Sequence, residues 1–245
     1  LLAVSLQPFW RPAIHLSELS WSNFFEFWSD AGSRAAIFNS ALLAIGTSTI
    51  VVLLAGLLAI AGKSIGGTVE KWFGVLTKVP SAIPHIVFAV GVLVAFGFAP
   101  FHLSGGWLIL FLAYVVVFLP SASIAAESSV QQVGDQLVEA SRVFGASAGR
   151  TFRRVQLPLI LPGLAAGWAM IFALVVGELN AAAILSGPRN PVIGYLILSL
   201  FDNGTYSQLA ALGVIIGLVS GVTVSAALLF ARPRFDQSAG LGGGQ

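Results

Sequence analysis

The chain has 245 residues, of which 57% are hydrophobic and only 9% are charged. Soluble domains usually carry about 25% charged residues, so this composition excludes an ordinary water-soluble globule and indicates a membrane protein. The formal net charge of +2 is too small to suggest a nucleic-acid partner. The sequence contains no cysteine, which excludes disulfides, thiolate metal sites and cysteine nucleophiles.

Long uncharged segments predict where the chain crosses a membrane. A helix rising 1.5 Å per residue needs about 20 apolar residues to cross about 30 Å of hydrocarbon. Five segments meet this requirement, and we therefore predict an all-α, polytopic helical membrane protein with about five spans. The predicted spans cover about residues 37–61, 79–98, 107–123, 157–177 and 209–231. Pro80 and Pro84 are expected to bend or delay the start of the second span, because proline removes backbone hydrogen bonds.

Basic residues orient these spans, because Lys and Arg near helix ends are retained on the cytoplasmic side. Segments 62–78, 126–156 and 232–245 hold nine of the 12 Lys and Arg residues. We expect these three segments to be cytoplasmic, with 232–245 as a cytoplasmic tail.

The same orientation places residues 1–36 outside as a periplasmic or interfacial segment, where Trp10, Trp21 and Trp28 suit the membrane interface. An odd number of spans with an external N-terminus implies a sixth span, or a fused half, upstream of Leu1.

Local motifs do not favour catalysis or metal binding. The sequence Gly62-Lys63-Ser64 resembles the end of a phosphate-binding loop, but five residues, not the required four, separate it from Gly56. His15, His85 and His102 lie far apart and lack carboxylates at metal-ligand spacing. No set of nucleophile, base and orienting group can be assembled, so a membrane enzyme is the least favoured alternative.

Glu178 is the charged residue nearest to the interior of a predicted span. It follows the cytoplasmic end of its span by about 20 residues and should lie near the outer interface. Two interpretations remain open, an interfacial carboxylate hydrogen-bonded by its neighbours or a part of a gate or substrate path. Ion-driven transporters usually need ionisable groups near the bilayer midplane, and none of the predicted spans carries a charge in its middle. An ion-coupled secondary transporter is therefore the less favoured class. If the protein transports a substrate uphill, a partner should supply the energy.

The polar stretch 126–156 contains apolar and small residues at helical spacing. Gly145 is expected to end that helix. A second helical piece over about 147–155 is expected to bring Arg150, Arg153 and Arg154 near the membrane before Pro158 opens the next span. A surface helix held by anionic lipid is the alternative interpretation. The residues expected on one face of the first helix are Val130, Val133, Leu137, Ser141 and Phe144.

Glycines at four-residue spacing predict close helix packing more readily than substrate contacts. They form two sets, Gly163 with Gly167, and Gly213 with Gly217 and Gly221.

One pattern in this stretch resembles a known family. Glu139-Ala140-Ser141, three residues, Gly145, nine residues and then Val155-Gln156-Leu157-Pro158 is similar to the cytoplasmic EAA loop of the permease subunits of bacterial ABC importers. The resemblance extends over about residues 39–232 and includes the proline-bearing segment 79–84. Ser141 stands where the family often has a second alanine, and His85 stands where relatives often have glycine.

The resemblance implies a type I ABC importer permease fold, with residues 37–231 as the transmembrane domain. It also implies that the EAA loop acts as a coupling helix seated in a groove of a separate ATPase subunit. The residues that it assigns to ATPase coupling are Glu139, Ala140, Ser141, Arg142, Gly145, Leu157 and Pro158. The candidates for a gate or substrate pathway are Pro84, His85, Glu178 and Asn180.

The partners implied by the resemblance are a cytoplasmic ATPase dimer, a periplasmic substrate-binding protein, membrane lipid and a second permease domain that is identical, different or fused. ATP and Mg would be held by the ATPase, so no cofactor and no enzyme activity are expected in this chain, which would reside in the bacterial inner membrane. Segments 177–192 and 202–206 are similar to permeases for ferric iron, aminoethylphosphonate, thiamine and polyamines. Ferric iron is the leading expectation, and the other three substrates are the alternatives.

Overall fold

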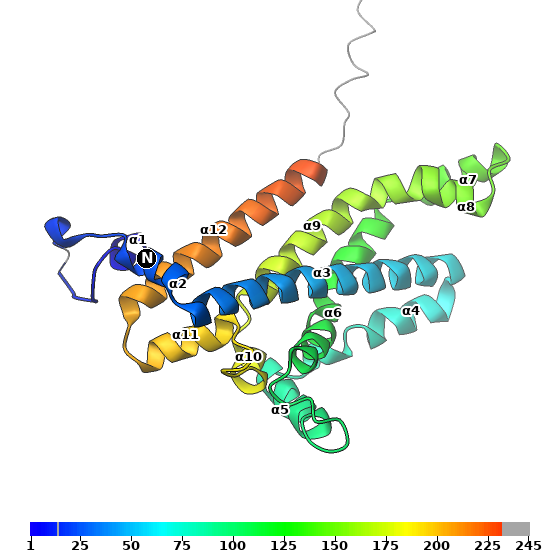
Figure 1. The fold of residues 1–245 in the computed structure, drawn as a ribbon. Coiled ribbons are helices and arrows are strands. Elements are labelled where there is room, and N and C mark those ends of the chain that lie inside the picture. The colour runs from blue at the N-terminus through cyan, green and yellow to red at the C-terminus, as the bar shows by residue number, and fades with distance from the viewer. Residues whose placement is uncertain (14, 232–245) are drawn as a thin grey trace, which may run out of the picture.

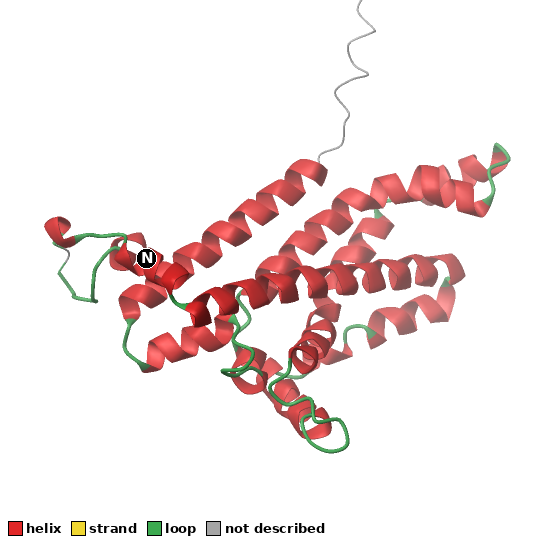
Figure 2. Cartoon of the chain, in the orientation of Figure 1, coloured by secondary structure: helices red, strands yellow, loops and turns green. Residues whose placement is uncertain are grey.

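A computed structural model describes residues 1–13 and 15–231, which form helices and no β-strand. Figure 2 shows these helices joined by loops. The expected tail, residues 232–245, lies outside the described residues. The α-helices are α1 (Leu2–Ser5), α2 (Ser22–Ser29), α3 (Ala31–Ile65), α4 (Gly67–Leu76), α5 (His85–Phe96), α6 (Trp107–Gln131), α7 (Asp135–Val143), α8 (Ala148–Thr151), α9 (Leu157–Val176), α10 (Asn180–Leu185), α11 (Ile193–Asp202) and α12 (Tyr206–Ala231). Short 3₁₀ turns occupy η1 (Leu16–Glu18) and η2 (Val79–Ala82), and η3 (Phe152–Gln156) is a π-helical turn.

Four helices in the described part of the chain are long and apolar enough to cross a membrane, which confirms an all-helical, polytopic fold. They are α3, α6, α12 and one continuous helix over Ala148–Val176 that contains α9. In Figure 1, α9 lies between α3 and α12, and α6 crosses behind α3 and packs against α3 and α9. The buried core lies among these helices and includes Leu43, Leu110, Ile171 and Leu212.

The expected second span is divided. Its region contains η2 and then α5, whose 12 residues reach only about 18 Å. Pro84 precedes the first residue of α5 with an extended ψ of 136°, so the helix begins directly after it, as the prolines predicted. This segment therefore does not form one continuous span like the other four.

Helix α4 lies in the segment expected to be a basic connection. Gly66 and Gly67 have φ values of 68° and 62°, which glycine adopts at little cost, and they turn the chain sharply after α3. The exposed side chains of Trp72, Val75 and Leu76 give α4 an apolar surface. The loop expected after α9 likewise contains two helices, α10 and α11.

The start of α3 is fixed by Asp30. Its carboxylate accepts a hydrogen bond of 2.6 Å from the Ser33 amide, which satisfies one of the free N–H groups of the first turn. Hydrogen bonds from the Ser33 side chain and backbone lower the pKa of the Asp30 carboxyl. At the same end of the molecule, Trp21 and Trp28 are exposed, which suits the interfacial position expected for the N-terminal segment.

The glycine sets have different surroundings. A Cβ at Gly163 would collide with the Ser129 side chain of α6, and one at Gly167 would lie 2.9 Å from the Cβ of Ala125. The first set is thus a packing seam between α9 and α6. A Cβ at Gly217 or Gly221 would meet nothing within 4 Å, so the second set is not a seam within the described chain.

Gly163→Val is therefore expected to destabilise the fold by about 1–3 kcal/mol, because an added side chain overpacks the contact between α6 and α9. Gly217→Val is the matched control and should change stability little. Thermal unfolding of the purified chain in detergent measures both effects. Equal unfolding midpoints for the two variants would show that the seam is not tightly packed.

Candidate functional site

The segment with the EAA pattern forms a helical hairpin of α7 and α8 at one end of α9 (Figure 1). Gly145 adopts a φ of 79°, and its N–H donates to the Arg142 carbonyl at 2.9 Å. The Ala146 N–H donates to the Ser141 carbonyl at 3.1 Å. These two bonds form a Schellman motif, the usual way in which a left-handed glycine ends a helix. The expected stop at Gly145 is confirmed.

A side-chain contact also joins the two arms of the hairpin. The Ser141 and Thr151 hydroxyls lie 3.0 Å apart and share a hydrogen bond, and Thr151 is only 2% exposed. Ser141 stands where the family pattern often has alanine, and an alanine could not form this hydrogen bond. The hairpin is held both at its turn and between its helices.

The prediction that one helix carries a continuous apolar face from Val130 to Phe144 is wrong. Helix α6 ends at Gln131 and α7 begins at Asp135, so the residues on either side of this break do not share one helix. Val130 and Val133 are buried and pack near Ile160. Leu137 is 52% exposed and Phe144 is 90% exposed.

The outer end of the hairpin is therefore an exposed apolar surface. It consists of Val143 and Phe144, which are 83% and 90% exposed and directly precede the turn at Gly145. We call these two residues the hairpin tip, and Leu137 lies about 9 Å farther back along α7. Nothing in the described chain covers the tip, and apolar surface of this kind marks a contact site.

The second arm of the hairpin continues into the span. Helix α8, the π turn η3 and α9 form one helix over Ala148–Val176, so Pro158 lies inside a helix and does not open a separate one. The Leu157 N–H donates to the Phe152 carbonyl, five residues earlier. Pro158 has no N–H, and its ring crowds the carbonyl of Arg154, which explains the wider turn here.

The residues expected to couple to an ATPase occupy α7, the turn at Gly145 and the start of α9. Glu139, Ala140 and Arg142 are exposed on α7, and Ser141 is half-buried. Leu157 and Pro158 form the first turn of α9. A groove of about 210 Å³ separates α7 from the end of α3 and is lined by Glu139, Arg142, Lys63 and Gln156, among others.

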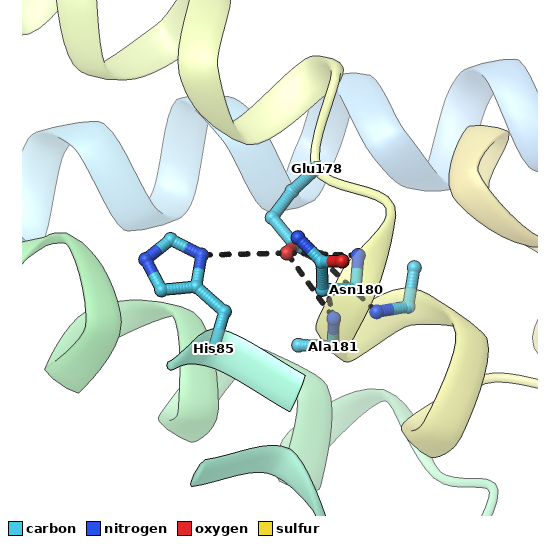
Figure 3. Close-up of polar contacts among 5 residues, drawn as sticks. His85, Glu178, Asn180 and Ala181 are labelled. Carbon is cyan, nitrogen blue, oxygen red and sulfur yellow. Dashed lines mark hydrogen bonds and ion pairs between the residues drawn. The ribbon is translucent and has the colours of Figure 1, made fainter. Parts of the chain in front are cut away.

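Glu178 lies at the opposite end of α9 and is 6% exposed. Its Oε1 accepts from the amides of Asn180 and Ala181 at 3.0 and 3.1 Å, and its Oε2 accepts from those of Ala181 and Ala182 at 3.0 and 3.1 Å (Figure 3). These amides begin α10 and would have no helical partner otherwise. The structure thus shows a buried carboxylate hydrogen-bonded by its neighbours, the first of the two interpretations.

Glu178 also faces α5. The Nδ1 of His85 lies 3.6 Å from Oε1, and the His85 ring is edge-on to Phe118 of α6, with ring centroids 5.8 Å apart. His85 of one segment therefore lies beside Glu178 of another, whose carboxylate also accepts from the Asn180 amide (Figure 3). The structure brings together three of the four candidate pathway residues, and the fourth, Pro84, directly precedes His85 in the chain. Because three amides occupy both carboxylate oxygens, Glu178 is better suited to hold helices together than to bind a passing solute.

Sequence reasoning missed an ion pair between Lys78 and Glu127, whose Nζ and Oε2 lie 2.7 Å apart. It joins the end of the α4 segment to α6 across 49 positions, and no local motif signals such a pair. It also missed Lys63, which donates to the Val130 and Val133 carbonyls at 3.3 and 2.8 Å and caps the end of α6. Within residues 1–13 and 15–231, no three His, Asp or Glu side chains are grouped to hold a metal ion.

Glu178→Gln is expected to destabilise the fold by about 1–3 kcal/mol, because the amide that replaces one oxygen cannot accept from the α10 backbone. Glu70→Gln removes an exposed carboxylate on α4 and is the matched control. Thermal unfolding in detergent compares the variants. A Glu178→Gln protein as stable as the control would mean that the carboxylate does not hold α10.

Comparisons with known proteins agree with this architecture. The family model described as "Binding-protein-dependent transport system inner membrane component" matches residues 52–237. The spermidine/putrescine transport system permease protein of Shigella flexneri is 28% identical over 231 residues, which cover 92% of this chain and 85% of that protein. A putative 2-aminoethylphosphonate transport system permease protein of Salmonella paratyphi A is 29% identical over 170 residues, covering 69% of this chain and 64% of that protein.

Two solved structures share the fold. A bacterial ABC transporter that imports the acidic polysaccharide alginate gives a TM-score of 0.74 at 18% identity, covering 96% of this chain and 88% of that chain. The inward-facing MetNI methionine ABC transporter gives 0.67 at 17% identity, covering 80% of this chain and 93% of that chain. These likenesses confirm the type I ABC importer permease fold. The family match covers most of the chain and includes the hairpin and the Glu178 contacts, so the chain belongs to the binding-protein-dependent transport system inner membrane components and is a permease subunit of an ABC importer.

Proposed function

We propose that the chain forms part of a substrate pathway through the bacterial inner membrane and couples transport to ATP hydrolysis by a separate ATPase subunit. The observation that carries this proposal is the helical hairpin, whose exposed apolar tip is fixed rigidly to a membrane-spanning helix. The tip supplies a surface for the ATPase, which holds ATP and Mg, and this chain supplies no catalytic group.

The geometry supports a hairpin that moves together with α9 as one rigid unit. The Schellman turn and the bond between Ser141 and Thr151 keep α7 and α8 from moving independently. Because α8 continues into α9, a displacement of the tip carries the whole of α9 with it. At the far end of α9, about 30 Å from Leu157, Glu178 connects α9 to α10 and lies beside His85 of α5. Closure of an ATPase dimer on two such permease domains would thus shift helices at the far side of the membrane.

The charge distribution supports a cytoplasmic hairpin and an external N-terminal segment. Arg142, Arg150, Arg153 and Arg154 all lie in or beside the hairpin, as the retention of basic residues on the cytoplasmic side requires. The opposite end, with the starts of α3 and α12, then faces a periplasmic substrate-binding protein. A second permease domain completes the pathway.

The relatives support a small substrate with a protonated amine. Spermidine, putrescine and 2-aminoethylphosphonate, named for the two relatives above, share this group. Ferric iron, the leading expectation from the sequence, finds no support in these names. We therefore propose polyamines first, since that relative covers more of the chain, and aminoethylphosphonate second.

Gly145→Leu is expected to weaken ATPase association about tenfold, because a side chain at a φ of 79° costs about 1–2 kcal/mol and the hairpin turn would open. Gly204→Leu places the same strain, at a φ of 70°, in the turn before α12 and serves as control. Affinity for the purified ATPase and uptake at equal membrane abundance are the measurements. Normal association and uptake by Gly145→Leu would remove the coupling role of the hairpin.

Cells carrying the complete transporter should accumulate radiolabelled putrescine or spermidine, or otherwise 2-aminoethylphosphonate, in an ATP-dependent manner. Uptake that an uncoupler abolishes while ATP is held constant would instead favour an ion-coupled carrier. Accumulation of ferric iron alone would contradict the amine proposal and leave the coupling proposal intact.

A further inference from the structure

A row of exposed residues leads from the hairpin along the start of the membrane-spanning helix. Arg150 of α8, Arg154 of η3, Pro158 and Leu161 follow one another at steps of three and four residues and are all exposed. Each residue of this row is about one helical turn from the next, with the wider turn η3 between Arg150 and Pro158. Leu161 is 50% exposed, so no other helix of the described chain covers this side. We call these four residues the basic row.

The basic row crosses the edge of the hydrocarbon layer. The uncharged run of α9 begins at Leu157, and its 20 residues span about 30 Å, the thickness of the hydrocarbon core. Arg154 then lies about 5 Å outside that edge and Arg150 about 10 Å outside it, while Leu161 lies about 6 Å inside. Lipid headgroups occupy roughly the 5–8 Å beyond the hydrocarbon. The row therefore places Arg154 at headgroup depth and Arg150 just beyond it, above apolar side chains at acyl-chain depth.

These arginines differ from the lysines at the same end of the molecule. Lys63 donates to backbone carbonyls, and Lys78 pairs with Glu127. Within the described part of the chain, no hydrogen bond or ion pair reaches the guanidinium groups of Arg150, Arg153 or Arg154. A guanidinium carries five N–H donors in a planar fork that fits a phosphate group bidentately. Three such forks within about 6 Å along the helix axis form a surface complementary to an anionic headgroup.

We propose that the basic row binds an anionic phospholipid of the adjacent leaflet. Arg154 and Arg150 hold its phosphate, Arg153 adds charge beside them, and the acyl chain lies along Pro158 and Leu161. A free phosphate would use only the arginines, whereas the exposed leucine below them calls for a ligand with a hydrocarbon chain. Depth argues against a soluble ATPase as the occupant, because its contact surface, the hairpin tip, lies at the outer end of the hairpin.

The test uses the whole transporter, purified in detergent, and phosphatidylglycerol as the probe. Native mass spectrometry titrates phosphatidylglycerol and phosphatidylcholine onto the wild type, the double variant Arg150→Gln/Arg154→Gln and the control Arg34→Gln/Arg189→Gln. The control removes the same charge from exposed arginines outside the basic row. A basic residue near an anionic surface contributes about 1 kcal/mol, or about fivefold, so the double variant should bind phosphatidylglycerol about 25-fold more weakly, with the control unchanged.

Two further measurements distinguish a bound phospholipid from simple charge attraction and from a bound free phosphate. Arg150→Lys/Arg154→Lys keeps the charge without the fork and should bind with intermediate affinity. Inorganic phosphate added in excess should not displace the lipid. The proposal is overturned if the double variant retains phosphatidylglycerol as the wild type does, if phosphatidylcholine binds equally well, or if inorganic phosphate displaces the lipid. It is also overturned if the variant loses the ATPase or the second permease domain while lipid binding is unchanged, because the row would then be a protein interface.

Discussion

The arrangement of helices around Glu178 depends on one buried carboxylate. A buried charge is costly unless it is paired or hydrogen-bonded, and here the N-terminus of α10 supplies three amides whose dipoles favour a negative group. The carboxylate and the helix end thus stabilise each other. Because Glu178 directly follows the turn that ends α9, and His85 begins α5 beside it, three helix ends are held within one small volume.

The two ends of the Ala148–Val176 helix are consequently built in different ways. At one end the hairpin is stiffened by its own backbone and by the bond between Ser141 and Thr151, yet its tip is bare. At the other end Glu178 is buried, and both of its carboxylate oxygens accept from amides of α10. Because the helix between the two ends is continuous, a displacement of the tip is carried to the junction at Glu178, and a displacement at the junction is carried back to the tip. The wide turn at Pro158 lies between them and leaves the helix continuous.

Apolar runs predicted most of this fold, because about 20 uncharged residues have few alternatives to a spanning helix. Proline chemistry also predicted the late start of α5, and Gly145 predicted the end of α7. Helical spacing failed across Val130–Phe144, since periodicity cannot reveal that the chain leaves α6 at Gln131 and begins a new helix at Asp135. The contact of His85 with Glu178 was also beyond prediction. Both residues were candidates, but only tertiary packing decides that segments 93 positions apart meet.

The way in which charges are satisfied bears on the source of energy. Glu178 is held by backbone amides, and the pair of Lys78 and Glu127 is joined directly. Moving a proton or an ion through either group would require breaking contacts that hold helices together, α9 to α10 in one case and the α4 segment to α6 in the other. An ion-coupled carrier needs ionisable groups that can change partners during each cycle. The charges in these contacts hold helices together, and the bare hairpin tip is the surface through which we propose that an external ATPase supplies the energy.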